Sequence, residues 1–178
     1  MRVVLYANVS ANGKILLSEN LNHQAPQEII NFSVQDIKQA KNLVMGRKSF
    51  EVFEKAFGGA AAIKAAFPDV EFVWLSTTAQ TNDERKVAKT PEEAVKYLSG
   101  KGIDKIIVGG GTETYNAFLE TDLITDVLFN VVPIITNGGD LGNSDKLNIK
   151  FKLAGQKLLT DDVIQLRYSR IERRKSQK

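Results

Sequence analysis

The spacing of apolar positions changes repeatedly along the chain and predicts alternating strands and helices. Short runs rich in apolar and β-branched residues predict strands over residues 3–9, 42–46, 70–76, 105–109 and 126–135. Between these runs, apolar residues recur at helical spacing and predict helices over residues 26–41, 47–57, 58–67, 90–102 and 112–120. Apolar strands separated by helices indicate a parallel sheet that is covered on both faces.

Helix-start signals occur in two of these segments. Thr90 is a favoured capping residue, Pro91 suits the first turn, and Glu93 completes a capping box. Within residues 26–41, Ser33 and Asp36 have the same spacing, and they allow this helix to form as two pieces.

The C-terminal part of the chain has a different pattern. Residues 151–159 and 161–171 are two further strand-like segments with no helix between them. In the second segment, Ile164, Leu166 and Tyr168 alternate with polar residues, which is the period of a half-buried strand. The predicted fold class is therefore α/β, with a mostly parallel central sheet flanked by helices and an antiparallel hairpin at its C-terminal edge.

Composition fits one domain and narrows the function. The 178 residues are 43% hydrophobic and 25% charged, which predicts a single domain over residues 1–172 and a basic tail over residues 173–178. There is no Cys and one histidine, His23, so neither thiol catalysis nor a metal site is expected. The net charge of +3 suits a phosphorylated small molecule, while no motif indicates nucleic-acid binding. No apolar run is long enough to span a membrane, so we expect a cytoplasmic protein without a membrane partner.

Residues that suit phosphate groups follow the strand predicted over residues 42–46. Gly46 permits a close turn, and Arg47, Lys48 and Ser49 then begin a helix. Free N–H groups at a helix start, with two cationic side chains, make an anion site. A solvated helix start with two charges is the simpler alternative.

Two more strand ends carry similar signals. Ser76 and Thr77 supply hydroxyl groups after one strand, and Gly109, Gly110 and Gly111 precede a helix after another. The glycines permit close approach of the backbone to a ligand, or simply a tight turn. Their spacing matches neither the phosphate loop of nucleotide hydrolases nor the G-x-G-x-x-G fingerprint. Three such ends of parallel strands can together hold an extended dinucleotide along one rim of the sheet.

Four segments, in order, resemble the dihydrofolate reductase superfamily. They read VSANGKI, NLVMGRKSFEVF, IIVGGGTETYNAFL and LITDVLFNVVPIITNGG. The last segment, and the spacing of the helix after the glycines, are most similar to the C-terminal reductase domain of the riboflavin biosynthesis deaminase/reductase and its stand-alone relatives. The resemblance implies an NADPH-dependent reductase that transfers hydride directly to a phosphoribosylaminouracil-like substrate, and it implies a homodimer.

The resemblance also implies site residues. Contacts with the cofactor are implied for Ala7, Gly46, Arg47, Lys48, Ser49, Ser76, Thr77, Gly109, Gly110, Gly111, Thr112 and Glu113. Contacts with the substrate are implied for Asn8, Ser10, Asn12 and Phe32. The usual Asp of the first segment is Asn12 here. This departure from the family pattern weakens the assignment of the substrate more than the assignment of the cofactor. No acid follows the strand at residues 76–78, which favours NADPH over NADH.

The resemblance makes Glu28 the expected catalytic residue, because dihydrofolate reductases carry a single acid on the helix after the long first loop, behind a Pro and ahead of a Phe. It lies four residues before Phe32, so the carboxylate and the ring share a helix face. A buried carboxylate beside an aromatic ring can protonate a ring nitrogen or a carbonyl oxygen. Two alternatives stay open: a dihydrofolate reductase that uses Glu28 as its acid on dihydrofolate, and a nucleotide-binding module without turnover.

Overall fold

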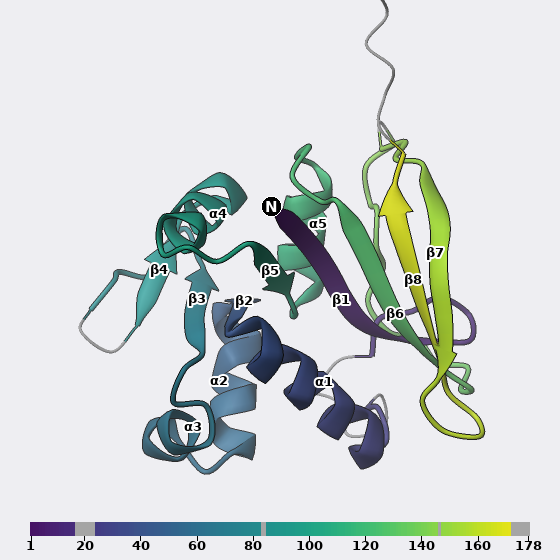
Figure 1. The fold of residues 1–178 in the computed structure, drawn as a ribbon, viewed down its shortest axis with the longest axis horizontal. Helices are drawn as coiled ribbons and strands as arrows, with labels where there is room; N and C mark the ends of the chain where they lie inside the picture. Colours follow the sequence, from purple (N-terminus) through teal and green to yellow (C-terminus); the bar gives the residue numbers. More distant parts are fainter. Residues whose placement is uncertain (17–23, 83–84, 146, 172–178) are drawn as a thin grey trace, which may run out of the picture.

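Strand β1 (Arg2–Ser10) lies inside a sheet, between two parallel neighbours. The structure, a computed structural model, describes residues 1–16, 24–82, 85–145 and 147–171. Over these residues the sheet has eight strands in the order β4-β3-β2-β5-β1-β6-β8-β7 (Figure 1). The other strands are β2 (Asn42–Gly46), β3 (Glu71–Leu75), β4 (Lys86–Ala88), β5 (Lys105–Val108), β6 (Asp126–Val132), β7 (Phe151–Leu158) and β8 (Ile164–Arg170). His23 and the basic tail lie outside the described residues.

The predicted fold class is confirmed. The neighbouring strands β4, β3, β2, β5, β1 and β6 all pair in parallel. Strand β8 runs antiparallel to both β6 and β7 at the C-terminal edge. Strand β4 was not predicted, because its three residues carry too short a pattern for recognition. Within the described residues, no helix is long and apolar enough to cross a membrane.

Helices lie on both sides of the sheet (Figure 1). They are α1 (Gln27–Ala40), α2 (Arg47–Ala56), α3 (Ala60–Ala66), α4 (Pro91–Gly100) and α5 (Thr112–Leu119). Alternate residues of β1 enter different layers: Leu5 packs with side chains of α4 and α5, whereas Val4 packs with those of α1, α2 and α3. Two covered faces explain why the parallel strands are apolar almost throughout.

Local signals set the helix ends only in part. The Thr90 hydroxyl accepts a hydrogen bond from the Glu93 N–H, as predicted, and the Glu93 carboxylate accepts one from the N–H of Lys89. The two-piece reading of residues 26–41 is wrong, because α1 is continuous. Ser33 lies inside it and donates its hydroxyl to the Ile29 carbonyl, which is the bond that a serine makes within a helix.

Where they begin, strands β2 and β5 are separated by a side chain. Further along, Val44 pairs with Val108, the Gly109 N–H donates to the Val44 carbonyl at 3.0 Å, and the Gly46 N–H donates to the Gly110 carbonyl at 3.3 Å. The fully buried amide of Asn42 fills the separation: its nitrogen donates to the Lys105 carbonyl at 2.7 Å, and its oxygen accepts from the Ile107 N–H at 3.0 Å. A side chain thus replaces missing backbone pairing and fixes the spacing of the two strands.

Candidate functional site

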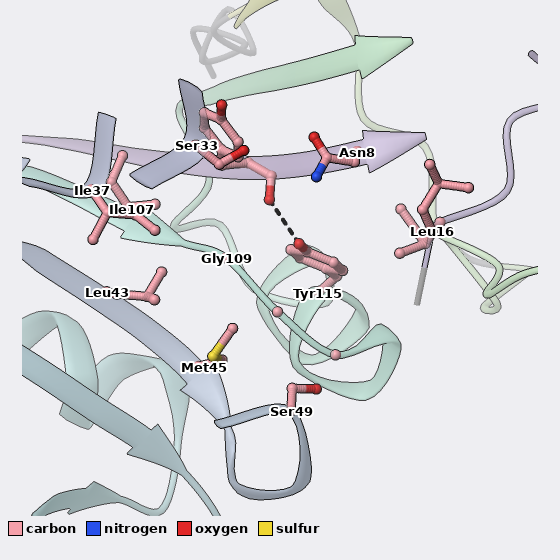
Figure 2. Close-up of a pocket in the computed structure, with 14 residues that line it drawn as sticks. Asn8, Leu16, Ser33, Ile37, Leu43, Met45, Ser49, Ile107, Gly109 and Tyr115 are labelled. Atoms are coloured by element: carbon pink, nitrogen blue, oxygen red, sulfur yellow. Dashed lines mark hydrogen bonds between the residues drawn. The ribbon is translucent and has the colours of Figure 1, made fainter. Parts of the chain in front are cut away.

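A cavity of about 140 Å³ opens between α1 and the ends of strands β1, β2 and β5 (Figure 2). It is lined by Tyr6, Asn8, Ile15, Leu16, Ser33, Ile37, Leu43, Met45, Ser49, Ile107, Gly109, Gly110, Gly111 and Tyr115. Its position at the carboxyl ends of parallel strands is where open α/β sheets bind ligands.

The cavity wall is neutral. Ile37, Leu43, Met45 and Ile107 form an apolar side, and hydroxyl and amide groups face them (Figure 2). None of the lining side chains, within the described parts of the chain, carries a charge. Such a wall suits an uncharged ring better than a phosphate.

A chain of amide groups supports one end of the cavity. The Asn130 nitrogen donates to the Asn8 oxygen at 2.8 Å and to the Tyr6 hydroxyl at 3.1 Å. The Asn130 oxygen accepts from the Gln165 amide at 3.0 Å. Asn130 is fully buried, so these bonds from β6 and β8 hold two cavity side chains of β1 in place.

The hydroxyl of Tyr6 stays protonated over the ordinary pH range. Burial raises its pKa, hydrogen bonds with Ser33 and Asn130 lower it, and the nearby Asp36 raises it, with a result of about 12. Tyr6 therefore offers the cavity a neutral phenol. Tyr115 of α5 also lines the cavity, and burial raises the pKa of its phenol as well.

Gly109 and Gly110 pack directly on side chains of strand β2, and Gly111 packs against Ser49 of α2. A Cβ atom at Gly110 would lie 2.7 Å from the Met45 Cε atom, and one at Gly46 would lie 2.7 Å from the Thr114 Oγ1 atom. Gly111 has φ +77°, a left-handed conformation that favours glycine. The glycines bring the start of α5 down to the rim of the sheet.

The starts of α2 and α5 offer uncapped N–H groups at this rim. Each begins after a glycine, and neither has a capping bond from a side chain, in contrast to the Thr90 cap of α4. Because β3, β2 and β5 are neighbours, the segments after them lie side by side, as the sequence predicted. Free N–H groups at adjacent helix starts attract anionic groups.

The segment after β3 is tied down by its own contacts. The Ser76 hydroxyl accepts from the Ala79 N–H at 3.1 Å, and Thr77 is exposed. Lys89 donates to the carbonyls of Thr77 and Ala79, which places a cation beside this turn. Lys89 lies twelve residues after Thr77 in the chain, so no local pattern connects it with this turn.

The structure brings part of the expected cofactor set together. Ser49 and the three glycines line the cavity, whereas the expected contacts Arg47 and Lys48 are exposed at the start of α2. Thr112 and Glu113 begin α5, with the Glu113 side chain exposed. Ala7 is buried against the opposite layer and does not line the cavity.

Glu28 does not have the buried setting on which its catalytic role was based. It is exposed in the first turn of α1, because the next residue, Ile29, is fully buried and sets the phase of the helix. Phe32 packs with Ile29 and Val132 instead of lining the cavity. The side chains of α1 that do reach the cavity are Ser33 and Ile37.

Ser10 and Asn12 link two loops. The Ser10 hydroxyl donates to the Asn12 oxygen at 2.7 Å, and the Asn12 nitrogen donates to the Thr136 carbonyl at 3.0 Å. A carboxylate could not make the second bond, so the amide at this position suits the contact. Neither residue lines the cavity, although Asn8 on the same strand does.

Sequence reasoning missed most of the cavity wall. Tyr6, Ser33, Met45 and Tyr115 were not selected, because they read as ordinary members of strands and helices. One signal was available: Tyr6 and Asn8 are two residues apart on a strand and must share a face.

Comparisons with known proteins agree with this geometry. Residues 24–164 match the family model of the RibD C-terminal domain. No curated protein sequence matches the chain. Among solved structures, a protein assigned to riboflavin biosynthesis in Shewanella sp. PV-4 superposes with a TM-score of 0.70 at 18% identity, over 97% of this chain and 100% of that one. A pyrimidine reductase-like protein of Corynebacterium diphtheriae gives 0.69 at 14% identity, over 97% and 92%. The family match extends over most of the sequence, and the chain belongs to the family of the RibD C-terminal domain.

Proposed function

We propose that this protein is an NADPH-dependent reductase that acts by direct hydride transfer on a pyrimidine substrate of the riboflavin-pathway type. The observation that carries the proposal is the adjacency of the segments after β3, β2 and β5 beside a neutral cavity. If an extended dinucleotide binds along this rim, the cavity remains open to hold the ring of the substrate. The family and the reductase-like neighbour support the same activity.

The residues at the rim fit a dinucleotide phosphate. A side chain at Gly110 or Gly46 would collide with Met45 or Thr114, so glycine lets the two segments pack closely at the rim. The two uncapped helix starts give N–H donors for a pyrophosphate, and Arg47 adds a cation. When bound, the nicotinamide supplies the hydride, and the chain supplies binding and orientation.

The segment after β3 favours NADPH over NADH. Ser76, Thr77 and Thr78 carry no negative charge, and Lys89 lies against the same turn. A 2′-phosphate is attracted by cations and hydroxyl groups, whereas an acid at this place would hydrogen-bond an unmodified ribose.

Cofactor titration tests the proposal. Intrinsic fluorescence is followed while NADPH or NADH is added, and then loss of NADPH absorbance is followed with the phosphoribosylaminopyrimidine substrate and, separately, with dihydrofolate. We expect saturable binding of NADPH, weaker binding of NADH, and turnover of the pyrimidine. If neither cofactor binds, the proposal fails.

A matched pair of variants locates the cofactor. Ser76→Asp introduces a carboxylate at the turn after β3, and we expect it to weaken NADPH binding more than NADH binding. Ser99→Asp makes the same change at an exposed position of α4 and should leave both unchanged. Binding without turnover of any acceptor favours a nucleotide-binding module, and turnover of dihydrofolate alone favours a dihydrofolate reductase.

A further inference from the structure

The amide of Asn8 faces the cavity with a defined polarity. Its oxygen accepts from Asn130, which lies outside the cavity wall. The opposite atom, the amide nitrogen, is therefore the one that points into the cavity, as Figure 2 shows. A nitrogen in this position is a hydrogen-bond donor.

Hydrogen bonds of Asn130 determine this polarity. Its oxygen accepts from the Gln165 amide nitrogen at 3.0 Å, so its amino group faces the opposite way, toward β1. There the amino group donates to the Tyr6 hydroxyl at 3.1 Å and to the Asn8 oxygen at 2.8 Å. The Asn130 amino group that serves Tyr6 also serves Asn8, so the Asn8 amide has one favoured orientation.

The charges around the cavity also favour an uncharged ligand. The lining residues are neutral, and Asp36 is the charged group beside Tyr6. The cations Arg47 and Lys48 are exposed at the start of α2 and do not line the cavity. An anionic group entering here would lose its hydration without gaining a cation.

We propose that Asn130 and Gln165 are positioning residues that hold the Asn8 N–H toward the cavity, which selects an uncharged ring with a hydrogen-bond acceptor. A phosphate on the same molecule would have to stay outside the cavity. The proposal rests on the proposed function only for the identity of this ring as the hydride acceptor. The selectivity of the cavity can be measured without NADPH.

Three small probes test the cavity directly. Acetophenone presents an acceptor, aniline presents a donor on a ring of similar size, and benzoate presents a negative charge. The chain has two methionines, and Met45 lines the cavity whereas Met1 is exposed. Methyl-labelled methionine therefore gives one NMR signal that reports the cavity and one that serves as an internal control.

Wild-type protein should bind acetophenone about tenfold more tightly than aniline, as expected for one matched against one mismatched hydrogen bond. Benzoate should leave the Met45 signal unchanged. Equal binding of acetophenone and aniline, a Met45 response to benzoate, or no Met45 response to acetophenone would each overturn the proposal.

Variants at Gln165 separate positioning from general damage, because this residue does not line the cavity. Gln165→Glu can only accept, so it draws the Asn130 amino group toward itself, and Asn8 must turn its oxygen to the cavity. We expect the preference for acetophenone to fall about tenfold or to reverse. Gln165→Leu removes the donor without adding a competing acceptor, so the preference should fall less than in Gln165→Glu and should not reverse.

Asn8→Asp provides an independent check at the cavity itself. It replaces the N–H with an oxygen of similar size, and acetophenone should lose its advantage over aniline. If Gln165→Glu and Gln165→Leu behave alike in folded protein, or if Asn8→Asp still prefers acetophenone, the positioning role is wrong. Lack of NADPH turnover with these preferences intact would refute the proposed function alone.

Discussion

The hydroxyl of Tyr115 on α5 donates a hydrogen bond to the main-chain carbonyl of Tyr6 on β1, at 2.7 Å. Strand β1 pairs with β5 only as far as Leu5, opposite Val108. The Tyr6 carbonyl lies just beyond this last pair, where the glycines lead the chain away from the sheet. The Tyr115 side chain therefore bonds β1 where pairing with β5 has ended, and it holds β1 in place at the edge of the cavity.

Replacing Tyr115 with phenylalanine tests this substitute for strand pairing. The buried Tyr6 carbonyl would lose its partner, and we expect the free energy of unfolding to fall by about 1–3 kcal/mol. Denaturant unfolding measures the change. Tyr97→Phe is the matched control, because the Tyr97 hydroxyl donates to Glu71 in a half-exposed place where Lys101 also pairs with that carboxylate. An equal loss in the two variants would mean that the Tyr115 bond has no special role.

The buried amide of Asn42 should be among the most sensitive polar positions. Alanine there leaves the Lys105 carbonyl and the Ile107 N–H without partners between β2 and β5. We expect a loss of about 2–5 kcal/mol in unfolding free energy. Asn143→Ala, at an exposed loop position, should change it by no more than about 0.5 kcal/mol. A small effect at Asn42 would show that the two strands can close their gap without it.

Much of the fold could be predicted because it depends on local pattern. The apolar period identified every long strand and helix, and the residues around Thr90 specified the cap of α4. Strand β4 escaped because its pairing with β3 is decided by tertiary contacts over three residues. Ser33 suggested a break in α1, yet helix continuity prevailed because Ile29 and Ile37 are buried on the same face.

The site was less accessible to sequence reasoning because it depends on which face a side chain takes. In a strand covered on both sides, Tyr6 and Ala7 are equally apolar in pattern, and only packing shows that Tyr6 faces the cavity. On α1 the buried position is Ile29, so the preceding residue, Glu28, faces the solvent. Asn130 and Gln165 act across three strands, and no spacing along the chain indicates such a contact.

An ion pair at the opposite end of β1 should make stability depend on acid. Burial raises the pKa of Asp126, but hydrogen bonds from Arg2, Thr125 and Ser169 outweigh it, so the pKa lies below its usual value. A carboxyl whose pKa is lowered by folding stabilises the protein above its unfolded pKa, near 4, and loses this contribution as the pH falls through the folded value. We therefore expect Asp126→Asn to be less stable than wild type near neutral pH.

The difference between these two proteins should shrink as the pH falls from about 5 to about 3, because wild-type Asp126 becomes protonated. Denaturant unfolding at several pH values measures it. Asp104→Asn is the control, since Asp104 is an exposed carboxylate near the start of the neighbouring strand β5 and its variant should track wild type throughout. A difference between wild type and Asp126→Asn that stays constant down to about pH 3 would contradict the assignment.

The last prediction concerns the two cations at the start of α2. Arg47 and Lys48 are exposed beside uncapped N–H groups, so reversing both charges should weaken NADPH binding about tenfold to a hundredfold, mainly by opposing its phosphates. Lys64→Glu with Lys96→Glu makes the same change in net charge on α3 and α4 and should have little effect. Added salt should weaken binding by wild type more than by the Arg47/Lys48 variant, because salt screens the attraction that only wild type retains. If both double variants lose the same affinity, the effect comes from net charge, and the start of α2 does not hold the phosphates.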